Sequence, residues 1–445
     1  MHRRPIAHLR GLLLVVLLAG SALAGSALAA GAQVRVAPDL EDVFAVLADA
    51  YPGPRPQAVE AGPTLGLQRG AVDLRDRSTV VVVPGVTLTR LADAAAAAAA
   101  AGAGEAEARA FQAFAISPDG QRALIGAGLL PASVTVVDQG GREVTVRQPV
   151  ARLASPYALA TYLAYAVGAG DRVVAGNFLG ARDPEGAAAM ARIDPRFPGI
   201  QAFIAQEATN VEAVAVVAPD VVFASARSEW IASVEAIGVP VIVFDGESQA
   251  QLTGAMRLAG ALFGPDAAAR AEAWVAYYDE IVAQVVAVTG VLEALPRVLF
   301  TGTNRTRVAS GEMYQSFLVG AAGGVSVTAG LGGYWNDVGV EQVIGWTPEV
   351  VLVPPYGQAS VAAVLEDETW RLVPAVRDGA VFRVPKLVAP WDTPVPDSVL
   401  ALVWLTEVLH PGLVGLSCVE ESAFFYDRFY GYELSVEEAT TLCAR

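Results

Sequence analysis

This chain has few of the residues that enzymes most often use as nucleophiles, bases or metal ligands. Its 445 residues include three histidines, and two of them, His2 and His8, lie in the N-terminal leader described below. The mature chain keeps only His410, which we interpret as a residue at the C-terminal end of a helix. A multi-histidine metal site and the Ser-His-Asp and Cys-His schemes are therefore excluded. The P-loop, HExxH and GxSxG motifs are also missing. We expect a binding protein without catalytic residues, metal or cofactor, and not an enzyme.

Positive charge is scarce as well. The chain has 30 basic and 46 acidic residues, a net charge of −16, and a single lysine, Lys386. Arginine therefore supplies nearly all of the cationic side chains. An acidic chain of this kind is a poor partner for nucleic acid or for an anionic membrane surface. Its length allows two or three domains, and a hydrophobic content of 54% is ample for their cores.

Cysteine is limited to Cys418 and Cys443, both in the C-terminal segment. In an oxidising compartment this pattern suggests one disulfide, which would stabilise the fold by roughly 3–4 kcal/mol through loop closure. Two buried free thiols are the alternative. Because no C-x-x-C motif is present, a redox site is not expected.

The first 29 residues have the pattern of a secretory signal peptide. Three arginines precede an apolar run at residues 11–24, and Ala27-Leu28-Ala29 forms a small-x-small cleavage site. A membrane anchor is the alternative, but the apolar run is short for a membrane span. No cysteine follows the cleavage site, so a lipid anchor is not expected. The leader predicts export to the periplasm.

From about residue 133, short apolar strands alternate with helices. Strands are expected at residues 150–154, 172–175, 220–224, 239–244, 297–301 and 350–353. A long helix, residues 265–290, separates the strands into two groups, at 133–264 and 291–445. The alternation predicts an α/β fold of two Rossmann-like lobes, each with a parallel sheet, joined by one long helix. Ligands bind such sheets at the carboxyl ends of the strands.

Several segments of this region resemble a known family. They are VTVVDQGGREVTV, PVARLASPYALATYLAYAVGAGDRVVAG, NVEAVAVVAPDVVFAS, GVPVIVFD, VGVEQVIGWTPEVVLVPP and PWDTPVPDSVLALVWLTEVLHP. In this order and spacing they resemble the class III periplasmic substrate-binding proteins of ABC importers, over about residues 134–430. The family includes binders of iron–siderophores, haem and vitamin B12. The resemblance implies two lobes bridged by a rigid helix.

The resemblance also implies a function and a partner. It implies a monomer that captures a metal complex, most often an iron(III)-siderophore or a related chelate, and delivers it to a membrane permease dimer. Family members carry one glutamate on each lobe that pairs with arginine on the permease. The matching positions are Glu212 and Glu341. Ordinary solvated helix charges are the alternative interpretation of both.

Candidate ligand-binding residues lie in the loops after the strands. They are Ser155, Tyr157, Asn177, Arg227 and Trp230 in the first lobe, and Arg305, Arg307, Tyr314, Trp335, Tyr356 and Trp391 in the second. A wider set adds Pro156, Phe178, Asn304 and Tyr334. Arginines beside aromatic rings suit an anionic or planar ligand. We favour Arg305, Arg307, Trp335 and Trp391, which lie in turn-like segments, and expect about half of the candidates to be packing residues.

Residues 30–132 precede the two lobes. QVRVAPDLEDVFAVLADAY and ARAFQAFAISPDGQRALIGAGLLPA resemble the opening and closing segments of type II molybdate-binding proteins. The segment is far shorter than such a protein, and Asp39, beside Pro38, would repel an oxyanion at a position where that family places serine. We expect a small, abridged α/β unit that binds nothing, with an unrelated spacer domain as the alternative. Its resemblance keeps molybdate or tungstate as an alternative ligand.

Overall fold

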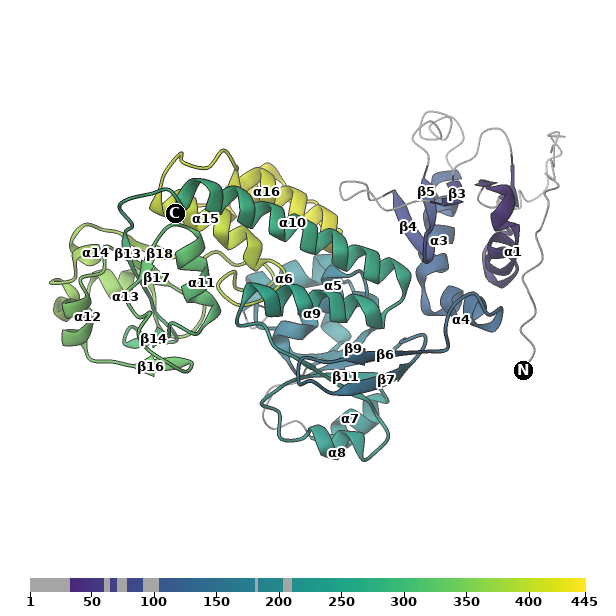
Figure 1. The fold of residues 1–445 in the computed structure, drawn as a ribbon, viewed down its shortest axis with the longest axis horizontal. Helices are drawn as coiled ribbons and strands as arrows, with labels where there is room; N and C mark the ends of the chain where they lie inside the picture. Colours follow the sequence, from purple (N-terminus) through teal and green to yellow (C-terminus); the bar gives the residue numbers. More distant parts are fainter. Residues whose placement is uncertain (1–32, 60–64, 70–77, 91–103, 181–182, 203–209) are drawn as a thin grey trace. The chain divides into compact units, whose positions relative to one another are not determined.

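The computed structural model describes residues 33–59, 65–69, 78–90, 104–180, 183–202 and 210–445 (Figure 1). The predicted signal peptide lies outside these residues. The chain divides into two compact units. The first comprises the residues up to Val134 together with Thr145–Ala151 and Gly260–Ala269, and the second contains the rest. None of the helices in the described part of the chain combines the length and apolarity that a membrane span requires.

The first unit is a small α/β fold, as expected from its sequence. Its five-stranded sheet has the order β2-β1-β3-β5-β4. The strands are β1 (Gln33–Val36), β2 (Gln57–Ala58), β3 (Leu65–Arg69), β4 (Thr79–Val83) and β5 (Val86–Arg90). Strand β1 runs parallel to β2 and β3, whereas β5 runs antiparallel to both β3 and β4.

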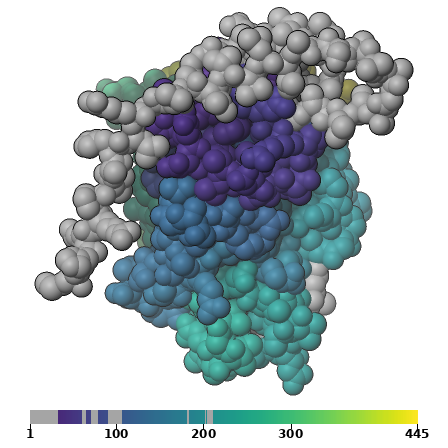
Figure 2. Space-filling view, turned by 90° about the vertical axis from the view of Figure 1, so that its right-hand side faces the viewer, coloured from purple at the N-terminus to yellow at the C-terminus, as the bar shows by residue number. Residues whose placement is uncertain are grey.

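The described residues of the first unit also form α1 (Glu41–Ala50), α3 (Gly104–Ile116) and α4 (Pro118–Gly126). Ser117 caps α4 by accepting a hydrogen bond from the Gly120 N–H. The core includes Val34, Leu67 and Phe111, and the N-terminal residues of the unit form the purple surface in the space-filling view (Figure 2). Asp39 is exposed and forms an ion pair with Arg69 at 2.6 Å.

The first lobe of the second unit contains a five-stranded sheet in the order β10-β9-β8-β11-β12, and its strand pairs are parallel. Its strands are β8 (Leu153–Ser155), β9 (Val173–Gly176), β10 (Gln201–Ala202), β11 (Val221–Ser225) and β12 (Val241–Phe244). The helices are α5 (Ala158–Ala166), α6 (Pro184–Ile193), α7 (Val211–Val217), α8 (Ile231–Glu235) and α9 (Gln249–Leu262). Every residue of β11 and β12 is buried, as expected for a parallel sheet covered on both faces. A hairpin of β6 (Ser133–Val137) and β7 (Glu143–Arg147) precedes this sheet.

The second lobe has a parallel sheet in the order β15-β13-β17-β18, at the left of Figure 1. Its strands are β13 (Arg297–Phe300), β15 (Val325–Ser326), β17 (Val350–Val353) and β18 (Val381–Arg383), and β14 (Arg307–Ala309) pairs with β16 (Trp335–Asp337) separately. The helices are α11 (Tyr314–Ala321), α12 (Val340–Trp346), α13 (Val361–Leu365), α14 (Pro374–Arg377), α15 (Ser398–Leu409), α16 (Cys418–Phe425) and α17 (Val436–Leu442).

Helix α10 (Pro265–Thr289) joins the two lobes and runs along both of them in Figure 1. Trp274, Tyr278, Ile281 and Val285 are buried at helical spacing along one stripe. The predicted fold class of two lobes with parallel sheets and one linking helix is confirmed.

The C-terminal segment is anchored by buried polar contacts. Asp397 accepts hydrogen bonds from the hydroxyls of Tyr426 at 2.6 Å and Tyr430 at 2.5 Å. A disulfide joins Cys418 and Cys443. His410 is the C-cap of α15, and its Nε2 lies 2.9 Å from the carbonyl oxygen of Gly323.

Candidate functional site

Loops from both lobes meet where their parallel strands end. Eight side chains form what we name the junction cluster: Tyr157, Arg227, Asp245 and Glu247 from loops after β8, β11 and β12, and Gln315, Tyr334, Tyr356 and Asp392 from the second lobe. Gln315 lies in the first turn of α11, and Tyr356 and Asp392 follow β17 and β18. The carboxyl ends of parallel strands are where α/β sheets bind ligands.

Direct contacts join the two lobes within this cluster. The guanidinium carbon of Arg227 lies 4.3 Å from the centre of the Tyr334 ring, a cation–π contact. Glu247 Oε2 accepts a hydrogen bond of 3.3 Å from the backbone N–H of Tyr314, at the start of α11. The positive end of a helix dipole favours a carboxylate at this place. The loop after β12 is thereby held against the second lobe.

The first-lobe side of the junction cluster is rich in negative charge. Burial, together with the neighbouring carboxylate of Asp245, raises the pKa of Glu247, and the Tyr314 N–H and Arg227 oppose this. Burial also raises the pKa of Tyr157 well above its usual value, and Glu247 and Asp245 add to the effect. These mutual influences indicate that the two carboxylates lie close to each other and to Arg227, which is itself exposed.

On the second-lobe side, Asp392 is completely buried. Its Oδ2 accepts a hydrogen bond of 2.6 Å from the Tyr356 hydroxyl and one of 3.5 Å from Gln315 Nε2. Asp392 Oδ1 and Gln315 Oε1 are buried and have no hydrogen-bond partner among the described residues. Burial raises the pKa of Asp392 to about 6, although Tyr356, Gln315 and the backbone N–H of Asp392 itself act in the opposite direction.

The sequence-predicted ligand residues therefore fall into three groups. Tyr157, Arg227 and Tyr356 lie in the junction cluster, together with Tyr334 from the wider set. Sequence reasoning missed Asp245, Glu247, Gln315 and Asp392. Asp245 and Glu247 directly follow the strand VIVF, so their position after a strand was a usable signal.

A second group of predicted ligand residues contributes to packing. The Ser155 hydroxyl lies 2.8 Å from that of Thr161, and Asn177 Nδ2 donates to the carbonyl of Pro156 at 3.2 Å. Trp230 belongs to the core of the first lobe. The buried Tyr314 hydroxyl contacts Tyr278 and Ser398. Trp391 is completely buried and donates its indole N–H to the Tyr426 hydroxyl at 3.2 Å. These five residues are left out of the site proposed below.

The two favoured arginines, expected to recognise an anion, have carboxylate partners. Arg305 lies 2.5 Å from Asp367, and Arg307 lies 3.2 Å from Asp337. Trp335 packs against the backbone at Gly302, where an added Cβ would approach its ring to 2.8 Å. Because carboxylates already compensate their charges, Arg305 and Arg307 give little support to the expectation that the ligand is an anion.

Glu212, the first predicted docking residue, is exposed in the first turn of α7. The C-terminal end of α7 is tied to the start of β8 through Arg152. The Arg152 backbone N–H donates to Asp220 Oδ2 at 2.8 Å, and its guanidinium Nη2 donates to the Val217 carbonyl at 2.7 Å. The helix carrying Glu212 is therefore fixed to the start of β8, the central strand of the first-lobe sheet.

The second lobe repeats this arrangement. Glu341 is exposed in the first turn of α12. The Arg297 backbone N–H donates to Glu349 Oε2 at 2.9 Å, and its Nη2 donates to the Trp346 carbonyl at 2.8 Å. The two glutamates thus occupy equivalent positions on equivalently attached helices.

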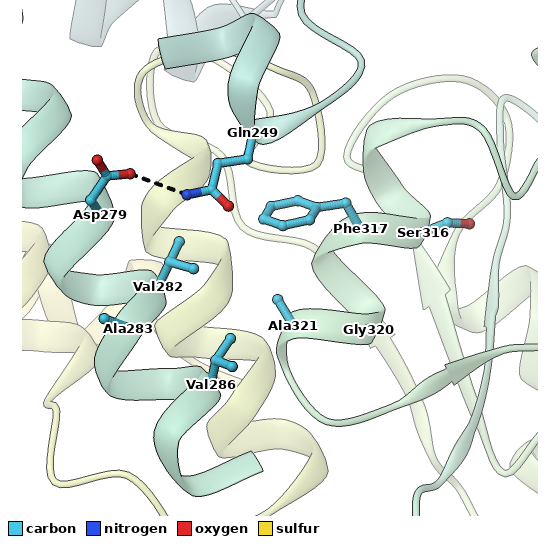
Figure 3. Close-up of a pocket in the computed structure, with 9 residues that line it drawn as sticks. All are labelled: Gln249, Asp279, Val282, Ala283, Val286, Ser316, Phe317, Gly320 and Ala321. Atoms are coloured by element: carbon cyan, nitrogen blue, oxygen red, sulfur yellow. Dashed lines mark hydrogen bonds between the residues drawn. The ribbon is translucent and has the colours of Figure 1, made fainter. Parts of the chain in front are cut away.

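A separate open cavity of about 700 Å³ lies between α10, α11 and the start of α9 (Figure 3). Val282, Val286 and Phe317 contribute to its largely apolar lining. Gln249 donates to Asp279 at 3.1 Å at one side of the cavity. None of the junction-cluster residues lines this cavity.

Comparison with known proteins identifies the class. Residues 160–387, just over half of the chain, match the family model described as periplasmic binding protein. The chain belongs to this family, which consists of binding proteins and not enzymes. It is 27% identical over 224 residues to the molybdate-binding protein MolA of Haemophilus influenzae, a match that covers 45% of this chain and 64% of MolA. The match thus spans less than two thirds of that relative.

Solved structures share the fold. A periplasmic solute-binding protein from Veillonella parvula has a TM-score of 0.61 and 21% identity, covering 70% of this chain and 96% of that one. MolA of Haemophilus influenzae bound to molybdate gives a TM-score of 0.61 at 20% identity, covering 68% and 99%. CeuE of Helicobacter pylori with Ni(II) bound gives 0.58 at 16% identity, covering 69% and 99%.

Proposed function

We propose that this chain is the substrate-binding protein of an ABC importer. Exported to the periplasm as a monomer, it captures a metal complex, an iron(III)-siderophore or a related chelate, and delivers it to the membrane permease. The observation that carries this proposal is the junction cluster, which is built by the strand-end loops of both lobes. A ligand held there contacts both lobes at once, as capture between two lobes requires.

The chemistry of the cluster favours a chelate over a small anion. Asp392 and Glu247 would repel a free dianion, and Arg227 is the single arginine of the cluster. Tyrosine rings such as Tyr157 and Tyr334 suit the larger, partly apolar surface of a metal chelate.

Molybdate or tungstate is the second candidate. The identity of 27% with a molybdate-binding protein favours it. For an oxyanion, Arg227 would supply the positive charge, and the nearby carboxylates would have to be protonated or turned away. Segments of residues 30–132 resemble type II molybdate-binding proteins, which agrees with this candidate. The resemblance does not indicate where an oxyanion would bind.

Ligand titration tests the proposal. The mature protein is titrated with ferric siderophores, haem, cobalamin, molybdate and tungstate, and the intrinsic fluorescence of its seven tryptophans is followed. Saturable quenching by a ferric chelate is expected. A response to the oxyanions alone would replace the first candidate with the second, and quenching by none of them would refute both.

Delivery is proposed to depend on Glu212 and Glu341, which would pair with arginines of the permease. The double variant Glu212→Ala/Glu341→Ala should lose transport and keep ligand binding, because two separated carboxylates fix the orientation of the complex. Glu420→Ala/Glu437→Ala is the matched control, since both residues are exposed in the first turn of a helix. Normal uptake by the first variant would remove this assignment.

A further inference from the structure

The junction cluster contains two buried acceptors that lack donors. Asp392 Oδ1 and Gln315 Oε1 have no hydrogen-bond partner among the described residues. Asp392 is completely buried and Gln315 is 2% exposed. Their side-chain ends meet, because Gln315 Nε2 lies 3.5 Å from Asp392 Oδ2. The two side chains therefore lie side by side in one buried polar region. Buried acceptors left without donors destabilise a fold, so such a pair in one site requires an explanation.

The surroundings of this pair supply no positive charge. The Tyr356 hydroxyl already donates to the other oxygen of Asp392. None of the ion pairs found among the described residues involves Asp392. Glu247, in the loop after β12, acts electrostatically on Tyr356, the hydrogen-bond donor to Asp392. Within the described part of the chain, Asp392 and Gln315 thus offer acceptors and negative charge, and no basic side chain forms an ion pair with Asp392.

We propose that the free oxygens of Asp392 and Gln315 receive a protonated amine of the ligand, so that the captured metal complex carries a cationic nitrogen. An alkylammonium group has three N–H donors and can serve both oxygens at once. Its charge also compensates the buried carboxylate, which binds a cation more strongly in a poorly solvated site than in water. This inference rests on the proposed function and specifies its substrate class.

Entry of the ligand requires the two lobes to separate at the cluster. Two contacts of the cluster join the lobes: the cation–π contact of Arg227 with Tyr334 and the hydrogen bond from the Tyr314 N–H to Glu247. Neither contact involves Asp392 or Gln315. Asp392 and Gln315 both belong to the second lobe, and the loop that carries Asp392 also contacts the first lobe, through the ion pair of Lys386 with Asp183 and the hydrogen bond from the Tyr162 hydroxyl to the Val388 carbonyl.

Two ferric chelates that differ by one charge test this inference. Ferrioxamine B is a ferric trihydroxamate with a free alkylammonium group, and its N-acetyl derivative is the same chelate with that group neutralised. The charged chelate should bind about 10- to 100-fold more tightly, the range expected for hydrogen bonds to a charged group. Equal affinities would overturn the inference and leave capture of ferric chelates standing. Binding of neither chelate would overturn both.

Two variants test whether the preference for the charged chelate depends on Asp392 and Gln315. Asp392→Asn and Gln315→Met should each reduce the preference for the charged chelate, and Asp392→Asn should nearly abolish it. Asp397→Asn is the matched control, because Asp397 is equally buried but both of its oxygens accept tyrosine hydroxyls. An unchanged preference in both variants of the pair, each folded by circular dichroism, would overturn the assignment.

Discussion

Asp392 should make the folded protein less stable at neutral pH than its asparagine variant. Burial raises its pKa from 3.8 to about 6 in the folded state. Because the folded pKa lies above the unfolded one, the folded state binds more protons between about pH 4 and 6, and stability is lost as the pH rises through this window. The shift of about two units, at about 1.4 kcal/mol per unit, corresponds to about 3 kcal/mol at pH 7.

Asp392→Asn removes this penalty and preserves the contacts. The asparagine carbonyl can still accept from the Tyr356 hydroxyl, and its amide can donate to the free Gln315 Oε1. The variant should therefore gain up to about 3 kcal/mol over the wild type at pH 7 and much less at pH 4.5.

Urea unfolding of both proteins from pH 4.5 to 8, followed by tryptophan fluorescence, measures this difference. It should rise through pH 5–6 and level off above pH 7. Glu293→Gln, at an exposed position, should show no such pH dependence. A difference between wild type and Asp392→Asn that does not change with pH would refute the reasoning, because the charged form of Asp392 would then carry no burial penalty.

Three further predictions concern other parts of the second unit. Cys418→Ser should lower the free energy of unfolding by roughly 3 kcal/mol, measured by urea unfolding without reductant, because the loop closed by the disulfide is opened. Tyr334→Leu should weaken binding of a ferric chelate about 2- to 5-fold in calorimetry, since an aromatic ring proposed to contact the chelate is lost, and unchanged affinity would contradict this. Arg152→Ala with Arg297→Ala should reduce uptake while chelate affinity stays within about 2-fold, because the docking helices lose their attachment to the sheets; normal uptake would show that these attachments are dispensable.

Much of the fold could be predicted because hydrophobic periodicity reports burial directly. The linking helix was expected at residues 265–290 and spans Pro265–Thr289. Its stripe of Trp274, Ile281 and Val285 is buried because a helix brings residues at this spacing to one face. The strand at 239–244 corresponds to β12, which is buried throughout. These features depend on local sequence, and local sequence was sufficient to locate them.

The site could be predicted only in part, because side-chain availability depends on partners distant in the sequence. Arg305 lies in a suitable loop, but Asp367 pairs with it from another segment of the same lobe. Trp391 lies in a turn-like segment, yet it is completely buried and bonded to Tyr426. Asp392, the next residue, has the free acceptor. Position after a strand indicates where a ligand site can form, and pairing in three dimensions decides which side chains are left to form it.

Two buried aspartates of this protein, Asp392 and Asp397, differ in their hydrogen-bond partners, although burial raises the pKa of both to about 6. Asp397 has hydroxyl donors on both oxygens and holds the C-terminal segment in place. Asp392 is equally buried but keeps one oxygen without a donor, beside a glutamine with the same deficit. A fold selected for stability alone would satisfy or remove such a pair, since an asparagine at 392 is expected to be more stable. The arrangement is understandable if the missing donor comes from the ligand, so that the free energy lost in the empty protein is recovered on binding. Asp392→Asn should therefore raise the free energy of unfolding at neutral pH and, in the same protein, reduce the preference for the charged chelate.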